Sequence, residues 1–345
     1  MKLKRFLLLA LLLPYTAIFA RYPIYYNPNY NISFGPFNAL HSFDGQKYGR
    51  VISLLVTKLL YPDTVKIPVN AEDDVYCRVS HEVVDKDLRL LHSEQYLESL
   101  NRSSSVARVT EVSALSCVPN FITQRLLLSP MRYAVQGTID ASMRAYTEKT
   151  ATINLGGGYH HAYANHGEGF CVYSDIGIII KKLKQMQPDI KVLYVDLDAH
   201  QGNGVSYIFK NDPNVIIFDM FGKDNYPVWG RDPKGVKYSY GLDFNIEDKE
   251  YLANVKLLQQ VIKQEAPDFI FYNAGTDILK GDKLGGFRVS KAGIIQRDEM
   301  VFQYAKENNI PVVMVTSGGY TKESAVVIAD SITNLVNKDL LKKEE

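Results

Sequence analysis

The sequence has few cysteines and almost no net charge. Its 345 residues include only three cysteines, and no two of them form a C-x₂₋₄-C pair, which excludes a disulfide-rich scaffold and a structural zinc knuckle. We expect Cys77, Cys117 and Cys171 to be buried thiols, although an oxidising compartment would permit a Cys77–Cys117 disulfide. The formal net charge is +1 and no long run of Lys or Arg occurs, so direct nucleic-acid binding is not expected.

Long apolar runs are also absent, except at the N-terminus. Three basic residues in the first five are followed by an apolar stretch at 6–20 that ends in a small residue, although Ile18 stands where a small residue is preferred. The stretch is shorter than the roughly 20 residues of a membrane span. We therefore expect a signal peptide at 1–20, export to the periplasm or the outside, and no membrane span in the mature chain. An uncleaved N-terminal anchor, or a buried first helix of an intracellular protein, is the alternative.

Repeats, low-complexity segments and flexible linkers are absent as well, which favours one domain over 21–345. From about residue 150 onward, short runs rich in β-branched residues alternate with amphipathic helical patterns. The expected strands are 152–156, 191–198, 214–221, 268–275 and 311–319, and the expected helices are 175–187, 248–265, 291–309 and 322–337. The nearly continuous apolar strands are typical of a parallel sheet that is covered on both sides. The pattern predicts a single α/β domain with an open, mostly parallel sheet and helices on both faces.

Polar residues capable of binding a metal follow the predicted strands. In "YVDLDAHQGNG" (194–204), Asp196, Asp198 and His200 stand at alternate positions, so they point to one side if the strand continues. Asp277, in "YNAGTD", follows another predicted strand. Ligands bind at the carboxyl ends of strands in such sheets. Two Asp and one His with an open fourth position are typical of catalytic zinc, so Asp198, His200 and Asp277 are the expected ligands, although iron or cobalt could use the same set.

Two further turns carry groups suited to acid–base chemistry. "GGGYHHA" (156–162) is not a phosphate-binding G-x-G-x-x-G loop, because His161 stands where the last glycine belongs. His160 and His161 could instead divide a proton-transfer cycle between them, with Asp196 orienting one ring. Tyr320 ends "SGGY" after the last strand, where its hydroxyl could donate to an oxyanion.

The motifs together resemble the zinc-dependent histone deacetylase family. "INLGGGYHHA", "GFCVYSD", "LYVDLDAHQGNG", "YNAGTDILKGDKLGGF" and "VTSGGYTKESA" occur in this order, and the similarity covers about residues 22–335. "DLDAHQGNG" and "NAGTDILKGDKLGG" are most similar to the class IV branch. The resemblance implies an arginase/deacetylase-like α/β fold.

The resemblance also implies a role for each matching residue. Asp198, His200 and Asp277 match the zinc ligands, and Tyr320 matches the tyrosine that polarises the substrate carbonyl. The tandem histidines that handle protons match His160 and His161, with Asp196 and Asn203 as their respective partners. Gly169, Phe170 and, more loosely, Tyr226 match the walls of the acyl-lysine channel. The family often also holds a monovalent cation such as K⁺ beside the strand that carries "DLD".

Asn203 replaces the Asp found in the best-known members. Because an amide stabilises an imidazolium less than a carboxylate does, we expect a lower pKa for His161 than Asp would give.

The sequence thus predicts a zinc-dependent hydrolase that removes acetyl or longer fatty acyl groups from lysine side chains of peptides or proteins. One alternative is an amidohydrolase acting on acetylpolyamines or other small acyl-amines. A two-metal ureohydrolase is less favoured, because only one D-x-H motif and one distant Asp are found. A non-catalytic, zinc-containing acyl-lysine binder is the alternative outside the enzymes. The sequence leaves acyl length, physiological substrate and oligomeric state open.

Overall fold

A computed structural model describes residues 21–32, 44–61, 71–227 and 236–343. The predicted signal peptide at 1–20 lies outside the described residues. Within the described ranges, none of the helices combines the length and the apolar character that crossing a membrane would require.

The described strands form a single parallel sheet. It has eight strands in the order β2-β1-β3-β8-β7-β4-β5-β6, and every neighbouring pair within this described part is parallel. The strands are β1 (Ile24–Tyr26), β2 (Cys77–Arg78), β3 (Ala151–Asn154), β4 (Val192–Asp196), β5 (Val215–Gly222), β6 (Tyr238–Leu242), β7 (Phe269–Asn273) and β8 (Val312–Val315). This confirms the predicted parallel α/β sheet.

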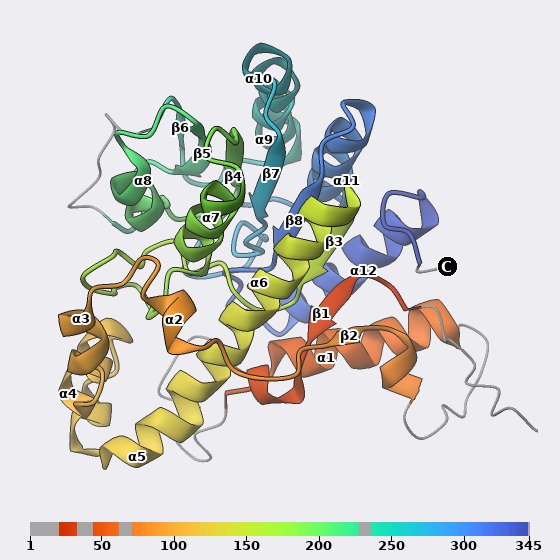
Figure 1. The fold of residues 1–345 in the computed structure, drawn as a ribbon. Coiled ribbons are helices and arrows are strands. Elements are labelled where there is room, and N and C mark those ends of the chain that lie inside the picture. The colour runs from red at the N-terminus through yellow and green to blue at the C-terminus, as the bar shows by residue number, and fades with distance from the viewer. Residues whose placement is uncertain (1–20, 33–43, 62–70, 228–235, 344–345) are drawn as a thin grey trace, which may run out of the picture.

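Helices cover both faces of this sheet. In chain order they are α1 (Lys47–Leu55), α2 (Asp85–Leu88), α3 (Glu94–Ser99), α4 (Ser103–Val109), α5 (Asn120–Thr123), α6 (Ser129–Glu148), α7 (Asp175–Met186), α8 (Asn203–Phe209), α9 (Asp248–Val255), α10 (Leu257–Glu265), α11 (Lys291–Glu307) and α12 (Glu323–Asn337). Helices α6 and α7 pack on one face, whereas α1, α11 and α12 pack on the other (Figure 1). The short helices α3, α4 and α5 lie near the end at which α6 begins, and α2 lies beside α6.

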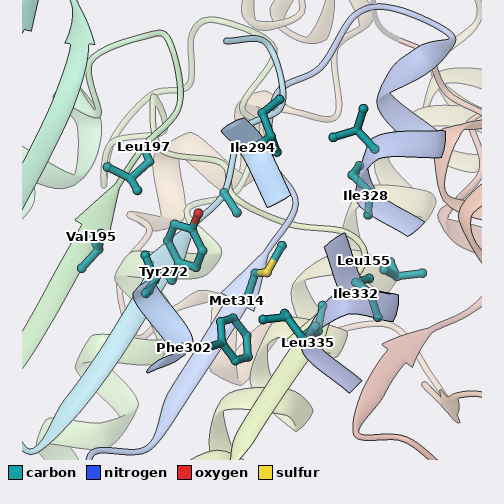
Figure 2. Packing of buried hydrophobic residues seen from close by; sticks show 14 of the residues in the cluster. Leu155, Val195, Leu197, Tyr272, Ile294, Phe302, Met314, Ile328, Ile332 and Leu335 are labelled. Carbon is teal, nitrogen blue, oxygen red and sulfur yellow. The ribbon is translucent and has the colours of Figure 1, made fainter. Parts of the chain in front are cut away.

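Alternate residues of the central strands build two cores, one under each layer of helices. In β4, Leu193 and Val195 join the core beneath α11 and α12, while Val192 and Tyr194 join the core beneath α6 and α7. Strands β7 and β8 alternate in the same way. Figure 2 shows the first core, where strand residues meet Ile328 and its neighbours on α12. Because both faces of the sheet are buried, the sequences of these strands are continuous runs of apolar residues.

Several features differ from the sequence prediction. The segment 248–265 forms two helices, α9 and α10, and β1, β2, β6 and α6 were not predicted. Helix α6 buries small and polar residues such as Thr138 and Ser142 beside its apolar ones, so it lacks a clear apolar stripe. The prediction of three buried thiols is confirmed only for Cys171. No disulfide joins any two of the three cysteines, which all lie in the described residues; Cys77 is partly exposed, and Cys117 is exposed because it ends a short turn at the surface.

Candidate active site

Four turns meet at the carboxyl edge of the sheet because their strands are neighbours in it. Strands β3, β8, β7 and β4 lie side by side, and their last residues pair in register. Asp196 pairs with Asn273, and both Asn273 and Asn154 pair with Val315. The chain therefore leaves all four strands at one level, and the polar groups that follow them converge.

Asp198, His200 and Asp277 form a compact buried cluster. One ligand atom from each lies within 4.8 Å of the other two. His200 Nδ1 lies 3.0 Å from Asp198 Oδ1 and 2.9 Å from Asp277 Oδ2. Asp198 follows β4 and Asp277 follows β7, so the adjacency of these strands brings the carboxylates together.

Backbone groups hold both carboxylates in place. The backbone N–H of Gly318 donates to Asp198 Oδ2 at 3.0 Å, and that of Ala199 donates to Asp277 Oδ1 at 3.0 Å. Gly318 must lack a side chain, because a Cβ there would lie 2.5 Å from Asp198 Oδ2 and 2.6 Å from Asp277 Oδ2. The glycine thus permits a close approach that fixes one oxygen of Asp198 and leaves the other facing His200.

The chemistry of this cluster suits a divalent cation. Burial and the charge of Asp198 raise the pKa of Asp277 to about 7. Each of the two buried carboxylates opposes the ionisation of the other, so a cation bound between them would stabilise both negative charges. Burial also disfavours charge on His200, but its hydrogen bonds to Asp198 and Asp277 outweigh this and raise its pKa. Among the described residues, this is the one group of three His, Cys, Asp or Glu side chains close enough to share a metal ion. One such group does not favour a two-metal centre.

His160 is paired with a carboxylate. Its Nδ1 lies 2.8 Å from Asp196 Oδ2, and both side chains are buried. Tyr194 Oη donates to the same oxygen at 2.5 Å, and Asn273 Nδ2 donates to Asp196 Oδ1 at 2.9 Å. Burial alone would lower the pKa of His160, but the charges of Asp196 and Asp198 outweigh it and raise the pKa to about 9.

His161 is paired with an amide instead. Its Nδ1 lies 2.7 Å from Asn203 Oδ1, and its ring centroid lies 4.0 Å from that of His160. Burial, together with the charges of His160 and His200, holds the pKa of His161 well below its usual range. The pKa values of these adjacent histidines are therefore shifted in opposite directions.

Two supporting residues were not found from the sequence. Asp175, the first residue of α7, accepts from the backbone N–H groups of Gly158 and Tyr159 at 2.9 Å each, which anchors the turn before the histidines. Buried Lys47 donates through Nζ to the carbonyl of Ser317 at 2.7 Å, and burial lowers its pKa to about 8. Each is the first residue of its helix, α7 and α1, so no helical periodicity marked it in the sequence.

The predicted channel residues border this cluster. The rings of Tyr226 and His161 stand perpendicular with centroids 5.0 Å apart, and Gly169 allows this, because a Cβ there would lie 2.5 Å from His161 Cδ2. Tyr320 lies edge-on to Phe170, with centroids 6.4 Å apart. The ring of Tyr320 also lies 6.3 Å from that of His200. All the predicted site residues therefore lie at this edge of the sheet.

A cavity of about 780 Å³ opens beside the cluster. It reaches His160, Asp198 and Tyr320 at one side. Its remaining wall is mainly apolar and includes Ile32, Val112, Leu115, Val118, Ile122, Leu126, Leu127 and Met131. Most of these residues come from the α4–α6 region, whose role in the site was not predicted.

Comparison with known proteins gives consistent matches. The family model described as histone deacetylase domain matches residues 41–336. Histone deacetylase 2 of Arabidopsis thaliana is 41% identical over 92% of this chain and 79% of its own. An uncharacterized protein of Picosynechococcus sp. is 29% identical over 87% of this chain and 93% of its own. The crystal structure of the HDA15 HD domain has a similar fold, with a TM-score of 0.68 at 20% identity over 93% of this chain and 89% of that one.

Proposed function

The chain belongs to the histone deacetylase family, and from this we propose that it is a zinc-dependent hydrolase that removes acyl groups from lysine side chains. The observation that carries the proposal is the buried Asp198–His200–Asp277 cluster directly beside two histidines with different partners. Two carboxylates and one imidazole would hold zinc and leave a position for water or substrate. Zinc bound there would polarise the amide carbonyl and lower the pKa of a water molecule.

The residues around this cluster divide the proton transfers. With Nδ1 facing Asn203, neutral His161 has Nε2 available to accept the proton of the attacking water. His160, paired with Asp196, is suited to remain protonated and to donate to the leaving amine. The Tyr320 hydroxyl would donate to the carbonyl oxygen as negative charge develops on it.

The cavity favours acyl groups longer than acetyl. A volume of about 780 Å³ with a mainly apolar wall far exceeds what one methyl group needs. Each buried methylene contributes about 0.8 kcal/mol, so affinity should increase with chain length until the cavity is filled. We propose that medium or long acyl-lysine is the preferred substrate.

A buried carboxylate supports the proposal of a monovalent cation beside β4. Asp219 is fully buried and pairs in register with Asp196, and its Oδ1 has no hydrogen-bond partner among the described residues. Burial and the charge of Asp196 raise its pKa well above the usual range. A cation such as K⁺ near this oxygen would compensate the charge.

An acyl-lysine peptide panel tests the function. The purified chain would be assayed on peptides from acetyl to myristoyl and on acetylated polyamines, before and after chelation and zinc addition. We expect turnover that chelator abolishes, zinc restores and longer acyl chains increase. Turnover of polyamines alone would favour the small-amine alternative, and metal binding without any turnover would contradict hydrolase activity.

A further inference from the structure

Glu168 occupies an unusual place at the edge of the candidate active site. It lies in the loop between β3 and α7, and 32% of its side chain is exposed. Nevertheless, Glu168 Oε1 accepts a hydrogen bond of 2.6 Å from Asn203 Nδ2, on a residue that is 1% exposed. The partly exposed Glu168 carboxylate is thus hydrogen-bonded to the buried Asn203 amide.

This contact determines which way the Asn203 amide faces. A carboxylate only accepts hydrogen bonds, so the group that faces Glu168 must be the amide NH₂. The same NH₂ lies 3.0 Å from Tyr163 Oη, which can accept as well as donate. The amide oxygen is then left to face His161 Nδ1, at 2.7 Å.

The amide orientation in turn determines where neutral His161 carries its proton. Facing a carbonyl oxygen, Nδ1 must be the protonated nitrogen, and Nε2 keeps its lone pair. If the amide turned over, its NH₂ would face Nδ1 and would favour the opposite tautomer. That tautomer has no lone pair at Nε2 and could not accept the proton of water. In a catalytic triad, the analogous wrong tautomer lowers kcat by about 10⁴.

We propose that Glu168 is a positioning residue that fixes, through the Asn203 amide, the tautomer of His161 required for proton abstraction. The proposal rests on the proposed function for its catalytic consequence, whereas the tautomer itself is independent of turnover. It also explains why an amide is tolerated at position 203. A carboxylate at position 203 would stand directly against the carboxylate of Glu168, where a 2.6 Å hydrogen bond now joins Asn203 and Glu168. The two negative charges would repel each other.

Exchanging the two partners tests this proposal. Glu168→Gln keeps the size of the side chain but can donate as well as accept, so it no longer dictates the amide orientation. We expect kcat to fall by roughly 10-fold or more in this variant. Asn203→Asp alone should also be impaired. The double variant Asn203→Asp/Glu168→Gln should recover most of the activity, because the new amide at position 168 can donate to the new carboxylate at position 203, which accepts from His161.

The tautomer can be read directly by ¹⁵N NMR of the imidazole in the metal-loaded full chain at neutral pH. We expect the His161 proton on Nδ1 in the wild type, a mixture in Glu168→Gln, and Nδ1 again in the double variant. Glu111→Gln is the matched control, since Glu111 is a second carboxylate close to Gly169 and Glu168, and it should retain Nδ1.

Two results would overturn the proposal: an unchanged tautomer with unchanged kcat in Glu168→Gln, or a double variant no better than Asn203→Asp. Wild-type protein without turnover on any acyl amide would instead refute the proposed function. The NMR comparison would still decide the role of Glu168 in that case.

Discussion

Two histidines adjacent in sequence acquire different chemistry from their partners. His160 faces the carboxylate of Asp196, and His161 faces the amide of Asn203. Both rings are buried, so burial alone would lower both pKa values. The carboxylate reverses this for His160, whereas the amide does not for His161. Such a separation of two pKa values allows one group to act as acid and the other as base.

Replacing the amide by a carboxylate should move the pH profile. In the Glu168→Gln background, Asn203→Asp puts a negative charge beside His161 without opposing Glu168. This charge should raise the pKa of His161, which burial now holds low. Because the base must be neutral, activity is lost as pH falls through this pKa. The acid limb of kcat/KM should therefore shift to higher pH than in Glu168→Gln alone, and a limb that stays in place would contradict the role of His161 as base.

Removing the Tyr320 hydroxyl should impair turnover more than substrate binding. Tyr320→Phe retains the edge-on ring contacts with Phe170 and His200, so the local packing is preserved. Loss of one donor to a developing oxyanion typically costs about 10²–10³ in kcat. Steady-state kinetics measures this, with Tyr207→Phe as the control, because the Tyr207 side chain is exposed on α8. A variant with wild-type kcat would remove Tyr320 from the proposed mechanism.

Residues on strand ends could be predicted, but their loop partners could not. Asp196, Asp198 and His200 alternate at the end of β4 and just beyond it, and this spacing predicted that they lie close together. Tyr194 stands two residues before Asp196 and could have been found by the same reasoning. Glu168 lies in a loop without periodicity, and its partner Asn203 is 35 positions away. No local pattern in the sequence links these two residues.

At the scale of elements, helices and strands could be predicted where their buried residues form a regular apolar pattern. The bounds of strands β4, β5, β7 and β8 differ from the predicted ones by one to four residues, because these strands are continuous apolar runs. Strands β1 and β2 have only three and two residues, too few for a periodic signal. Helix α6 was missed because small and polar side chains fill its buried face. The apolar cavity wall comes from this less regular region, so it was not predicted either.

One buried arginine on helix α11 is hydrogen-bonded to the turns that carry Asp198 and Asp277. Arg297 is fully buried, its Nη1 donates to the carbonyl of Gly275 at 2.6 Å, and its Nε donates to Asp298 Oδ1 at 2.8 Å. Nη1 also approaches the carbonyl of Leu197, which precedes Asp198, at 3.3 Å. Arg297→Met would leave Asp298 as a buried charge without its cation.

We expect Arg297→Met to lower the free energy of unfolding by about 3–5 kcal/mol. Urea denaturation followed by circular dichroism measures the change. Arg89→Met serves as the control because its ion pair with Glu94 lies on the surface, and its denaturation midpoint should change little. Equal midpoints for the two variants would show that the buried ion pair contributes no more than the exposed one.

At the scale of the whole molecule, parallel topology makes one site from distant segments. His160 precedes Asp277 by more than a hundred positions, and the sheet order places their strands two apart. The order of strands depends on the packing of α6, α7, α11 and α12 on the two faces, which no single motif encodes. The sequence nevertheless predicted the meeting of the four turns, because in a parallel sheet all carboxyl ends lie at one edge.

A metal ligated from two strand ends should stabilise the entire fold. Asp198 follows β4 and Asp277 follows β7, so a bound cation favours only the state in which these strands are paired. Binding to the folded state alone adds about 2.7 kcal/mol when free metal is roughly a hundred times Kd. Thermal unfolding of the chelated protein should therefore shift upward as zinc is added. Asp277→Asn, which can still accept from the backbone of Ala199, should unfold at a temperature that zinc barely changes. A zinc-dependent shift of equal size in both proteins would place the metal elsewhere.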